Sequence, residues 1–175
     1  LLTQINNISA SDFFPFREQT LLTNGRQTAG NIFYENNESI KKIERLIRSE
    51  IAHYRSHFAT KLDGFITKWP TKYQLFGWLI SFENGGELEP HIHENGWLSG
   101  SVYINVPEDT GSESGNLVFS ISEKKQQKQS TSQKDIVFRV ETGSFCLFPS
   151  SLYHYTTLFQ SSGKRVVLAF DIIPD

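Results

Sequence analysis

Two histidines separated by one residue form the first pattern in the sequence that could carry out chemistry. They are His91 and His93, in the segment PHIHE at residues 90–94. Residues two apart in a β-strand project from the same face, so the two imidazoles would point together. Imidazole is the commonest protein ligand for first-row transition metals. The pair therefore indicates a metal site, although such a pair alone is a weak signal.

A third histidine strengthens this interpretation. His154 follows residues 144–149, which we expect to form a strand ending at a proline turn, and it would open the next strand. A closed antiparallel sheet brings strands that are distant in sequence side by side, so His154 can face the pair. Three histidines on one side of a metal leave coordination positions open for substrate and oxygen. We therefore predict a metal site made of His91, His93 and His154.

Arg165 stands at the start of an apolar segment, residues 165–173, where a charged side chain is unusual. It either reaches solvent at the strand end or points into the sheet interior. Burial of a guanidinium is costly without an anionic partner. An inward Arg165 would therefore suit a ligand carboxylate, which its planar fork can bind through two hydrogen bonds.

Residues 98–105 alternate between polar and apolar side chains, which places Ser101 and Tyr103 on one face of a strand. That polar face either meets water or lines a ligand cavity. In a cavity, the Tyr103 hydroxyl could reach the same carboxylate as Arg165.

The elements that must position these residues are short strands. Apolar runs bounded by turn residues predict strands at residues 75–82, 98–106, 116–122, 136–140, 144–149, 154–159 and 165–173. Asn84-Gly85-Gly86 predicts a turn after the first of them. We expect a mainly β fold with its barrel core at residues 73–173. Residues 107–115 form an acidic loop, and residues 123–135 form either a solvated hairpin tip or a substrate-contacting loop.

One helix is expected within residues 36–60, because apolar residues recur there three and four apart. Asn36 or Asn37 can cap this helix. Its apolar stripe, which would pack outside the sheet, consists of Ile40, Ile43, Leu46, Ile47, Ile51, Tyr54 and Phe58. The other residues of the first third are expected to be extended. His53 and His57 are four apart on this helix and are expected at its surface.

The composition fits one domain over residues 1–175, although a chain that begins with Leu1 can also be a piece of a longer protein. The net charge of −2 gives no reason to expect nucleic acid or an anionic membrane as a partner. Cys146 is the one cysteine, which excludes an intramolecular disulfide and favours a reducing, cytoplasmic location. We expect Cys146 to be a small buried apolar residue. The sequence contains no indication of oligomeric state.

The order of these motifs resembles the 2-oxoglutarate/Fe(II)-dependent oxygenases, in particular the prolyl-hydroxylase-like branch and its uncharacterised bacterial members. The resemblance runs from Trp78 to Phe170. Besides the histidines, the arginine and the strand tyrosine, it includes GNLVF at residues 115–119 and GSFCLFPS at residues 143–150. It implies a double-stranded β-helix, or jelly roll, with the helix packed outside the sheet.

The resemblance also implies a site. In that family the first histidine of an H-x-D/E pair and a distal histidine hold Fe(II), and these match His91 and His154. The far carboxylate of the cosubstrate 2-oxoglutarate would meet Arg165 and Tyr103, with Ser101 beside them. His93 stands where the family has a carboxylate, and Glu94 would point away from His91 in a regular strand. The implied activity is a dioxygenase reaction, most simply hydroxylation of a small molecule, peptide or protein with molecular oxygen.

Two other interpretations remain open at this stage. A cupin shares the barrel and would use three histidines without 2-oxoglutarate, but Trp97 and Leu98 stand where a cupin has a glutamate, and a cupin gives no reason for Arg165. A jelly-roll binding module without catalysis would make the three histidines coincidental.

Overall fold

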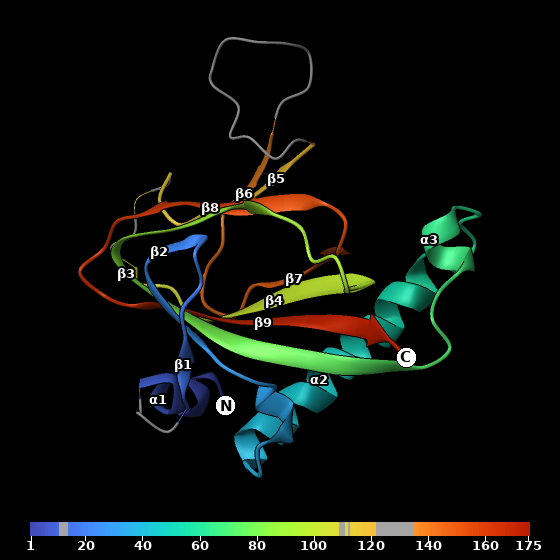
Figure 1. The fold of residues 1–175 in the computed structure, drawn as a ribbon, viewed down its shortest axis with the longest axis horizontal. Coiled ribbons are helices and arrows are strands. Elements are labelled where there is room, and N and C mark those ends of the chain that lie inside the picture. The colour runs from blue at the N-terminus through green and yellow to red at the C-terminus, as the bar shows by residue number, and fades with distance from the viewer. Residues whose placement is uncertain (11–13, 109–110, 112, 122–134) are drawn as a thin grey trace.

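The computed structural model describes residues 1–10, 14–108, 111, 113–121 and 135–175. The described part of the chain is dominated by a curled antiparallel sheet with helices against its outer face (Figure 1). Its elements are α1 (Leu2–Ala10), β1 (Phe16–Arg17), β2 (Leu22–Thr28), η1 (Ile32–Tyr34), α2 (Glu38–His57), α3 (Gly64–Thr67), β3 (Tyr73–His91), β4 (Leu98–Asn105), β5 (Leu117–Ser120), β6 (Ile136–Phe138), β7 (Phe145–Pro149), β8 (Tyr153–Phe159) and β9 (Arg165–Pro174).

The sheet closes because the long strand β3 takes part in two layers. The strand order is β6-β5-β8-β3-β9-β4-β7, with β2 also paired to β3 and β1 paired to β2. Residues 73–82 of β3 pair with β9, whereas residues 86–91 pair with β8. Figure 1 shows β3 sweeping from the layer of β9 and β4 into the layer of β8 and β5. The expected jelly-roll arrangement, mainly β with a helix outside the sheet, is confirmed.

The predicted turn at residues 84–86 is wrong, because β3 continues through it. On β2, Thr23 lies opposite Glu87 and Gly25 lies opposite Phe82, so the residues between them on β3 bulge out of the ladder. Gly85 has φ of 79°, a backbone conformation that turns and bulges both require. The bulge bends β3 from one layer to the other, and this bend brings its end over the site.

Alternation along the strands separates two apolar cores. In β9, Val166, Leu168 and Phe170 belong to the core shared with α2, together with Leu98 and Val102 of β4. The opposite face of β9 carries Val167 and Ala169, which pack inside the curled sheet with Tyr103, Ile80 and Phe82. The polar face predicted for residues 98–105 is therefore an inner face.

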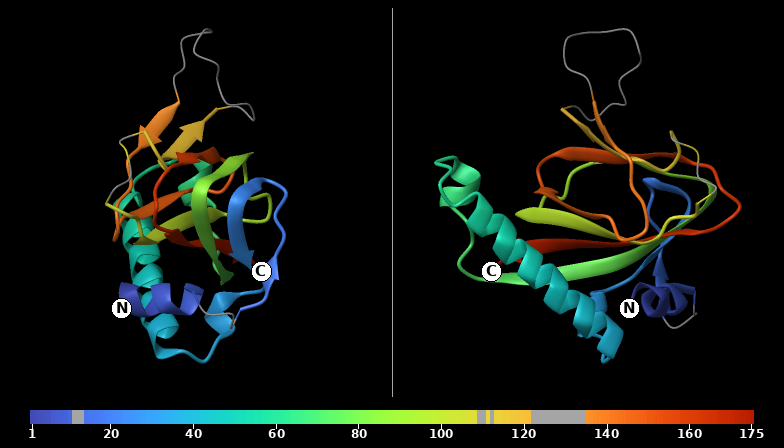
Figure 2. Two further views of the ribbon diagram at one scale, coloured as in Figure 1. Left: turned by 90° about the vertical axis from the view of Figure 1, so that its left-hand side faces the viewer. Right: turned by 180° about the vertical axis from the view of Figure 1, so that it is seen from behind.

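Helix α2 lies across the outer face of the sheet (Figure 2). Asn37 caps it, since its side-chain oxygen accepts hydrogen bonds from the backbone N–H groups of Ser39 and Ile40. The buried residues on its sheet-facing side are Ile40, Ile43, Ile47 and Ile51. Leu46 was expected in this stripe, but it is 53% exposed, because a neighbour of Ile47 points about 100° away around a helix.

Three further expectations need correction. Residues 2–10, expected to be extended, form α1, whose Ile5 is completely buried against the α2 core. The short α3 was also not expected. Cys146 is half-buried rather than buried and packs at the edge of the inner core.

His53 and His57 lie on α2 with neither in a metal-ligand cluster among the described residues, as expected of surface histidines. Of the segment 123–135 only Asp135 is described, and of the loop 107–115 residues 109, 110 and 112 are outside the described part. Among the described helices, none has the length and apolar character needed to cross a membrane.

Candidate metal centre

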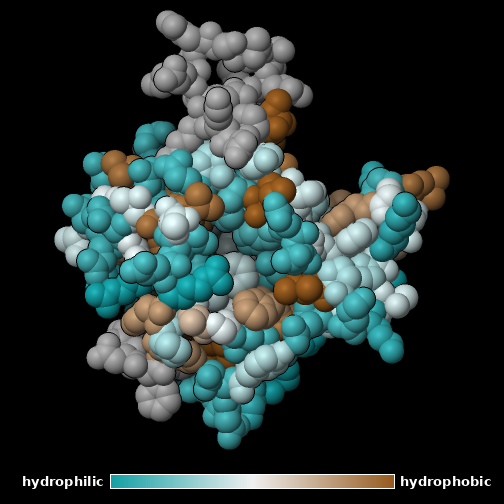
Figure 3. Space-filling view, viewed as in Figure 1, coloured by the Kyte–Doolittle hydropathy of each residue, from teal (hydrophilic) through white to brown (hydrophobic). Residues whose placement is uncertain are grey.

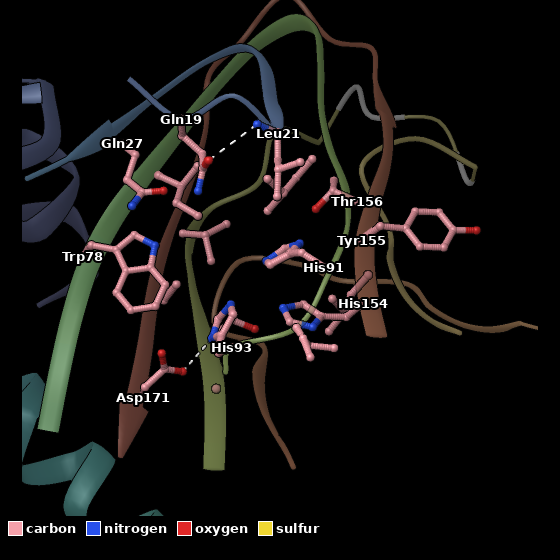
Figure 4. Close-up of a pocket in the computed structure, with 18 of the residues that line it drawn as sticks. Gln19, Leu21, Gln27, Trp78, His91, His93, His154, Tyr155, Thr156 and Asp171 are labelled. Carbon is pink, nitrogen blue, oxygen red and sulfur yellow. Dashed lines mark hydrogen bonds and ion pairs between the residues drawn. The ribbon is translucent and has the colours of Figure 1, made fainter. Parts of the chain in front are cut away.

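Three histidine side chains converge inside the curled sheet. His91 ends β3 and lies directly opposite His154 of β8, so the pairing of these two strands sets their separation. His93 lies just beyond β3, where its backbone N–H donates to the Ser150 carbonyl at 3.0 Å. The potential ligand atoms of the three residues lie within 4.8 Å of one another. Figure 4 shows the three rings facing a common space.

Each of the three rings already uses its Nδ1 atom in a hydrogen bond. His91 Nδ1 lies 2.8 Å from the Glu89 carbonyl oxygen, and His154 Nδ1 lies 3.0 Å from the Leu152 carbonyl oxygen. A carbonyl oxygen only accepts hydrogen bonds, so both Nδ1 atoms must donate. His93 Nδ1 is 2.7 Å from a carboxylate oxygen of Asp171. The Nε2 atoms are thus left as the ligand atoms of all three rings.

The environment keeps two of these imidazoles uncharged. Burial lowers the pKa of His91 from an ordinary value of 6.5 to about 4, and the neighbouring His93 lowers it further while the Glu89 carbonyl opposes the shift. Burial also lowers the pKa of His154 well below its ordinary value, with both other histidines adding to the effect. Metals bind the neutral imidazole, so near neutral pH these rings are in the form that binds.

Asp171 was not singled out from the sequence. It lies on β9 and shares an inner face with Arg165, because residues an even number apart along a strand project from the same side. A carboxylate in the middle of the apolar segment 165–173 was the signal that could have revealed it. Glu94, in contrast, is exposed and does not belong to the histidine cluster.

The three histidines line a cavity inside the curled sheet, and the buried residues Arg165, Tyr103 and Ser101 line the same cavity. We call the part lined by these three residues the deep end of the cavity. Arg165 is only 1% exposed, and its Nε and Nη1 atoms have no hydrogen-bond partner among the described residues. Its guanidinium lies over the rings of Phe82 (4.8 Å) and Tyr103 (5.1 Å). The solvent-exposed alternative for Arg165 is therefore wrong. No carboxylate of the described residues forms an ion pair with it.

Tyr103 and Ser101 complete this end. Burial raises the pKa of Tyr103, although the Arg165 guanidinium opposes the shift, so its hydroxyl remains a donor at neutral pH. The Ser101 hydroxyl is buried and also lacks a partner in the described part of the chain. Unpartnered buried polar groups cost free energy, and a bound anion would satisfy them. This end of the cavity fits a carboxylate.

All six predicted residues line one cavity of about 440 Å³. Trp78, whose ring centroid is 5.5 Å from that of His93, and Gln27 lie on the wall opposite Tyr155 (Figure 4). Arg17, Gln19 and Asn95 also belong to the lining. The space-filling view shows a hollow near the centre of this face, with hydrophilic residues around much of its rim (Figure 3).

A family model described as "Putative 2OG-Fe(II) oxygenase" matches residues 77–171. The chain belongs to this family. All six predicted site residues lie within the matched range, and the protein is accordingly an Fe(II)-dependent oxygenase with 2-oxoglutarate as cosubstrate. The family match decides for the oxygenase over the cupin and the binding module. No curated protein sequence matches the chain.

Solved structures share the oxygenase fold at low sequence identity. A prolyl-4-hydroxylase of Pseudomonas putida is 10% identical with a TM-score of 0.64, over 99% of this chain and 83% of that one. A prolyl hydroxylase of Trichoplax adhaerens, in complex with a hypoxia inducible factor peptide fragment, is 17% identical with a TM-score of 0.66, over 98% and 76%. HygX of Streptomyces hygroscopicus, with nickel and 2-oxoglutarate bound, is 13% identical with a TM-score of 0.65, over 99% and 78%.

Proposed function

We propose that this oxygenase holds Fe(II) through the Nε2 atoms of His91, His93 and His154 and binds the far carboxylate of 2-oxoglutarate with Arg165. The observation that carries the proposal is the buried guanidinium of Arg165, whose Nε and Nη1 atoms have no hydrogen-bond partner among the described residues, in the same cavity as the three imidazoles. A three-histidine site alone would serve many metal enzymes, whereas a buried cation beside it calls for an anionic cosubstrate.

In this proposal, the histidines bind the metal and a second group of residues binds the cosubstrate. The three imidazoles would hold the metal, at which the 2-oxo acid end of the cosubstrate and oxygen would bind. Arg165, with the hydroxyls of Tyr103 and Ser101, fixes the other end of the cosubstrate by charge-assisted hydrogen bonds. When bound, the iron and 2-oxoglutarate supply the oxidation, in which O2 converts 2-oxoglutarate to succinate and CO2 and hydroxylates a substrate C–H bond.

The substrate contacts the wall formed by Trp78 and Gln27. Gln27 is 8% exposed and lines the cavity, so its carboxamide can donate to or accept from a ligand there. The Trp78 ring beside His93 offers a flat apolar surface next to the metal.

These groups suit a small molecule or a peptide or protein side chain, and structures of relatives exist with either a peptide fragment or hygromycin B bound. We propose a cytoplasmic location because a single free cysteine is typical of a reducing compartment. The proposal includes neither nucleic acid nor membrane as a partner. That residues 1–175 act as one domain, with residues 36–60 supporting a core at 73–173, stays a prediction.

The proposal is tested by adding Fe(II) and 2-oxoglutarate to the purified protein under argon and recording the visible absorption spectrum. We expect a new absorption band that requires both additions, followed by release of succinate when oxygen is admitted. The His154→Ala variant should show neither signal, because it lacks a ligand from β8. Absence of the band from the wild-type protein, with the metal and cosubstrate in excess, would refute the proposed function.

A further inference from the structure

We infer that Asp171 is the positioning residue that lets His93 take the place of the carboxylate ligand in the family's H-x-D/E pair. The inference rests on the proposed function, since it assigns a role within the same iron site. Asp171 lies on β9. Its described hydrogen bonds go to His93 and Ser99, and none goes to His91, His154 or Arg165.

The contact between His93 and Asp171 defines which ring nitrogen is free. Nδ1 of His93 lies 2.7 Å from Oδ1 of Asp171, a short distance typical of a charge-assisted hydrogen bond. A carboxylate accepts hydrogen bonds, so the proton resides on Nδ1 and the lone pair on Nε2. Figure 4 shows the Asp171 carboxylate beside the His93 ring, on the side away from His154.

The carboxylate itself is held in place by a buried hydroxyl pair. Ser99 Oγ donates to Asp171 Oδ1 at 2.6 Å and lies 2.8 Å from Ser150 Oγ. Ser99 and Ser150 are completely buried, and Asp171 is nearly so. The oxygen that accepts from His93 thus also accepts from Ser99, which limits the positions the carboxylate can take.

The backbone segment after His93 packs closely against Ser150 and Asp171. The N–H of Trp97 donates to the Ile172 carbonyl at 2.8 Å, which ties the segment after His93 to the strand that carries Asp171. A side chain at Gly96 would bring a Cβ atom within 2.5 Å of Ser150 Oγ and 3.4 Å of Asp171 Cγ. A glycine is therefore needed for this segment to close over the serine and aspartate pair.

The charge of the site explains why such a partner is needed. Replacing a carboxylate ligand by a neutral imidazole removes one negative charge from the metal's ligands. Asp171 returns that charge one residue further from the metal, and its hydrogen bond makes the His93 ring a better electron donor. Loss of a partner of this kind lowers metal affinity by about 10- to 100-fold in comparable sites.

The test measures binding of Co(II) alone to the purified apoprotein, by calorimetry and by the visible spectrum of bound Co(II). We expect Asp171→Asn to weaken Co(II) binding by about 10- to 100-fold. The matched control is Asp135→Asn, which makes the same change at a carboxylate that accepts a hydrogen bond from the Tyr155 hydroxyl at 2.9 Å, away from the histidines. The control should bind Co(II) as the wild type does.

A double-mutant cycle shows whether Asp171 acts through His93. His93→Ala should weaken Co(II) binding by itself, and adding Asp171→Asn to it should cause no further loss. A wild-type affinity in Asp171→Asn, with His93→Ala impaired, overturns the role of Asp171 and leaves the iron site standing. An equal loss from Asp171→Asn in the presence and absence of His93 also overturns it. Unimpaired binding in His93→Ala refutes both the third ligand and its partner.

One measurement needs no variant and so does not depend on whether Asp171→Asn folds. In the wild-type apoprotein with ¹⁵N-labelled histidine, NMR distinguishes a protonated Nδ1 from a protonated Nε2. We expect the proton of neutral His93 on Nδ1. A proton on Nε2 would overturn the inference, because the hydrogen bond to Asp171 could not then be made.

Discussion

Replacing Arg165 by methionine should stabilise the apoprotein, which lacks metal and cosubstrate. The same substitution should greatly weaken the binding of 2-oxoglutarate. In the apoprotein the guanidinium is completely buried, with two nitrogen atoms unpartnered among the described residues. Methionine preserves the apolar stem that packs near Phe82 and Tyr103 but removes the buried charge. Replacing a buried ion pair by apolar residues of similar volume has stabilised proteins by about 1–4 kcal/mol, and we take the same range for this single buried charge. For a chain of this length we expect Tm to rise by roughly 2–15 °C.

The effect on cosubstrate binding has the opposite sign. Two charge-assisted hydrogen bonds to the far carboxylate, each contributing about 1.5–3 kcal/mol, amount to about 3–6 kcal/mol. This corresponds to a loss of affinity of about 10²- to 10⁴-fold. With 2-oxoglutarate at about 100 times its wild-type Kd, the ligand stabilises the wild type by about 2.7 kcal/mol. The same concentration should stabilise Arg165→Met by less than about 0.5 kcal/mol.

The assay is thermal unfolding under argon, first of the apoprotein and then of the Co(II)-loaded protein with and without 2-oxoglutarate. Arg48→Met serves as the control, because Arg48 lies on the exposed side of α2 and pairs with Glu44 there. It should leave the shift caused by 2-oxoglutarate unchanged. An equal shift in Arg165→Met and wild type would show that the carboxylate binds elsewhere. A large loss of apoprotein stability would contradict the argument that this charge is a cost without ligand.

The folded state also determines how pH, core substitutions and metal removal should change stability. The pKa of His91 is lowered to about 4 in the folded state, so the unfolded chain binds more protons between pH 6.5 and about 4. The free energy of unfolding of the apoprotein should therefore fall as the pH falls through this window, by about 3 kcal/mol from this residue. Urea unfolding of the wild type and of His91→Gln should show a weaker pH dependence of this free energy in the variant, and an identical pH dependence would contradict the prediction. Ile47→Ala should lower the free energy of unfolding in urea by about 2–5 kcal/mol because Ile47 is fully buried, and the neighbouring Leu46→Ala should lower it by less than about 0.5 kcal/mol. Neither substitution should change the affinity for Co(II), and equal losses of stability would refute the orientation of α2. Removing metal from the Co(II)-loaded protein with a chelator should lower Tm, since ligands that bind only the folded state stabilise it; an unchanged Tm would mean that no site of useful affinity exists.

Regular strand patterns made the inner face of the fold predictable from the sequence. Alternation at residues 98–105 placed Ser101 and Tyr103 together, and the structure finds both inside the sheet. His91 and His154 were expected in strands that the fold brings together, and they lie opposite each other. These predictions succeed because the two-residue period of a strand determines which side chains share a face.

Other features depend on contacts that no local pattern contains. Asn84-Gly85-Gly86 permits a positive φ, and both a turn and a bulge need one, so the sequence could not distinguish them. Helix α1 is short, and its Ile5 is buried only because α2 and the sheet provide a surface for it. Asp171 carried a readable signal as a lone carboxylate in an apolar strand. Its pairing with His93, which lies 78 residues away in sequence, became visible only in the folded structure.

A structure of the protein with Fe(II) and 2-oxoglutarate, prepared under argon, tests the central claim most directly. We predict one metal ion bound by the Nε2 atoms of His91, His93 and His154, with the far carboxylate of 2-oxoglutarate on Arg165. A metal bound without His93, or a cosubstrate whose far carboxylate does not contact Arg165, would contradict the account.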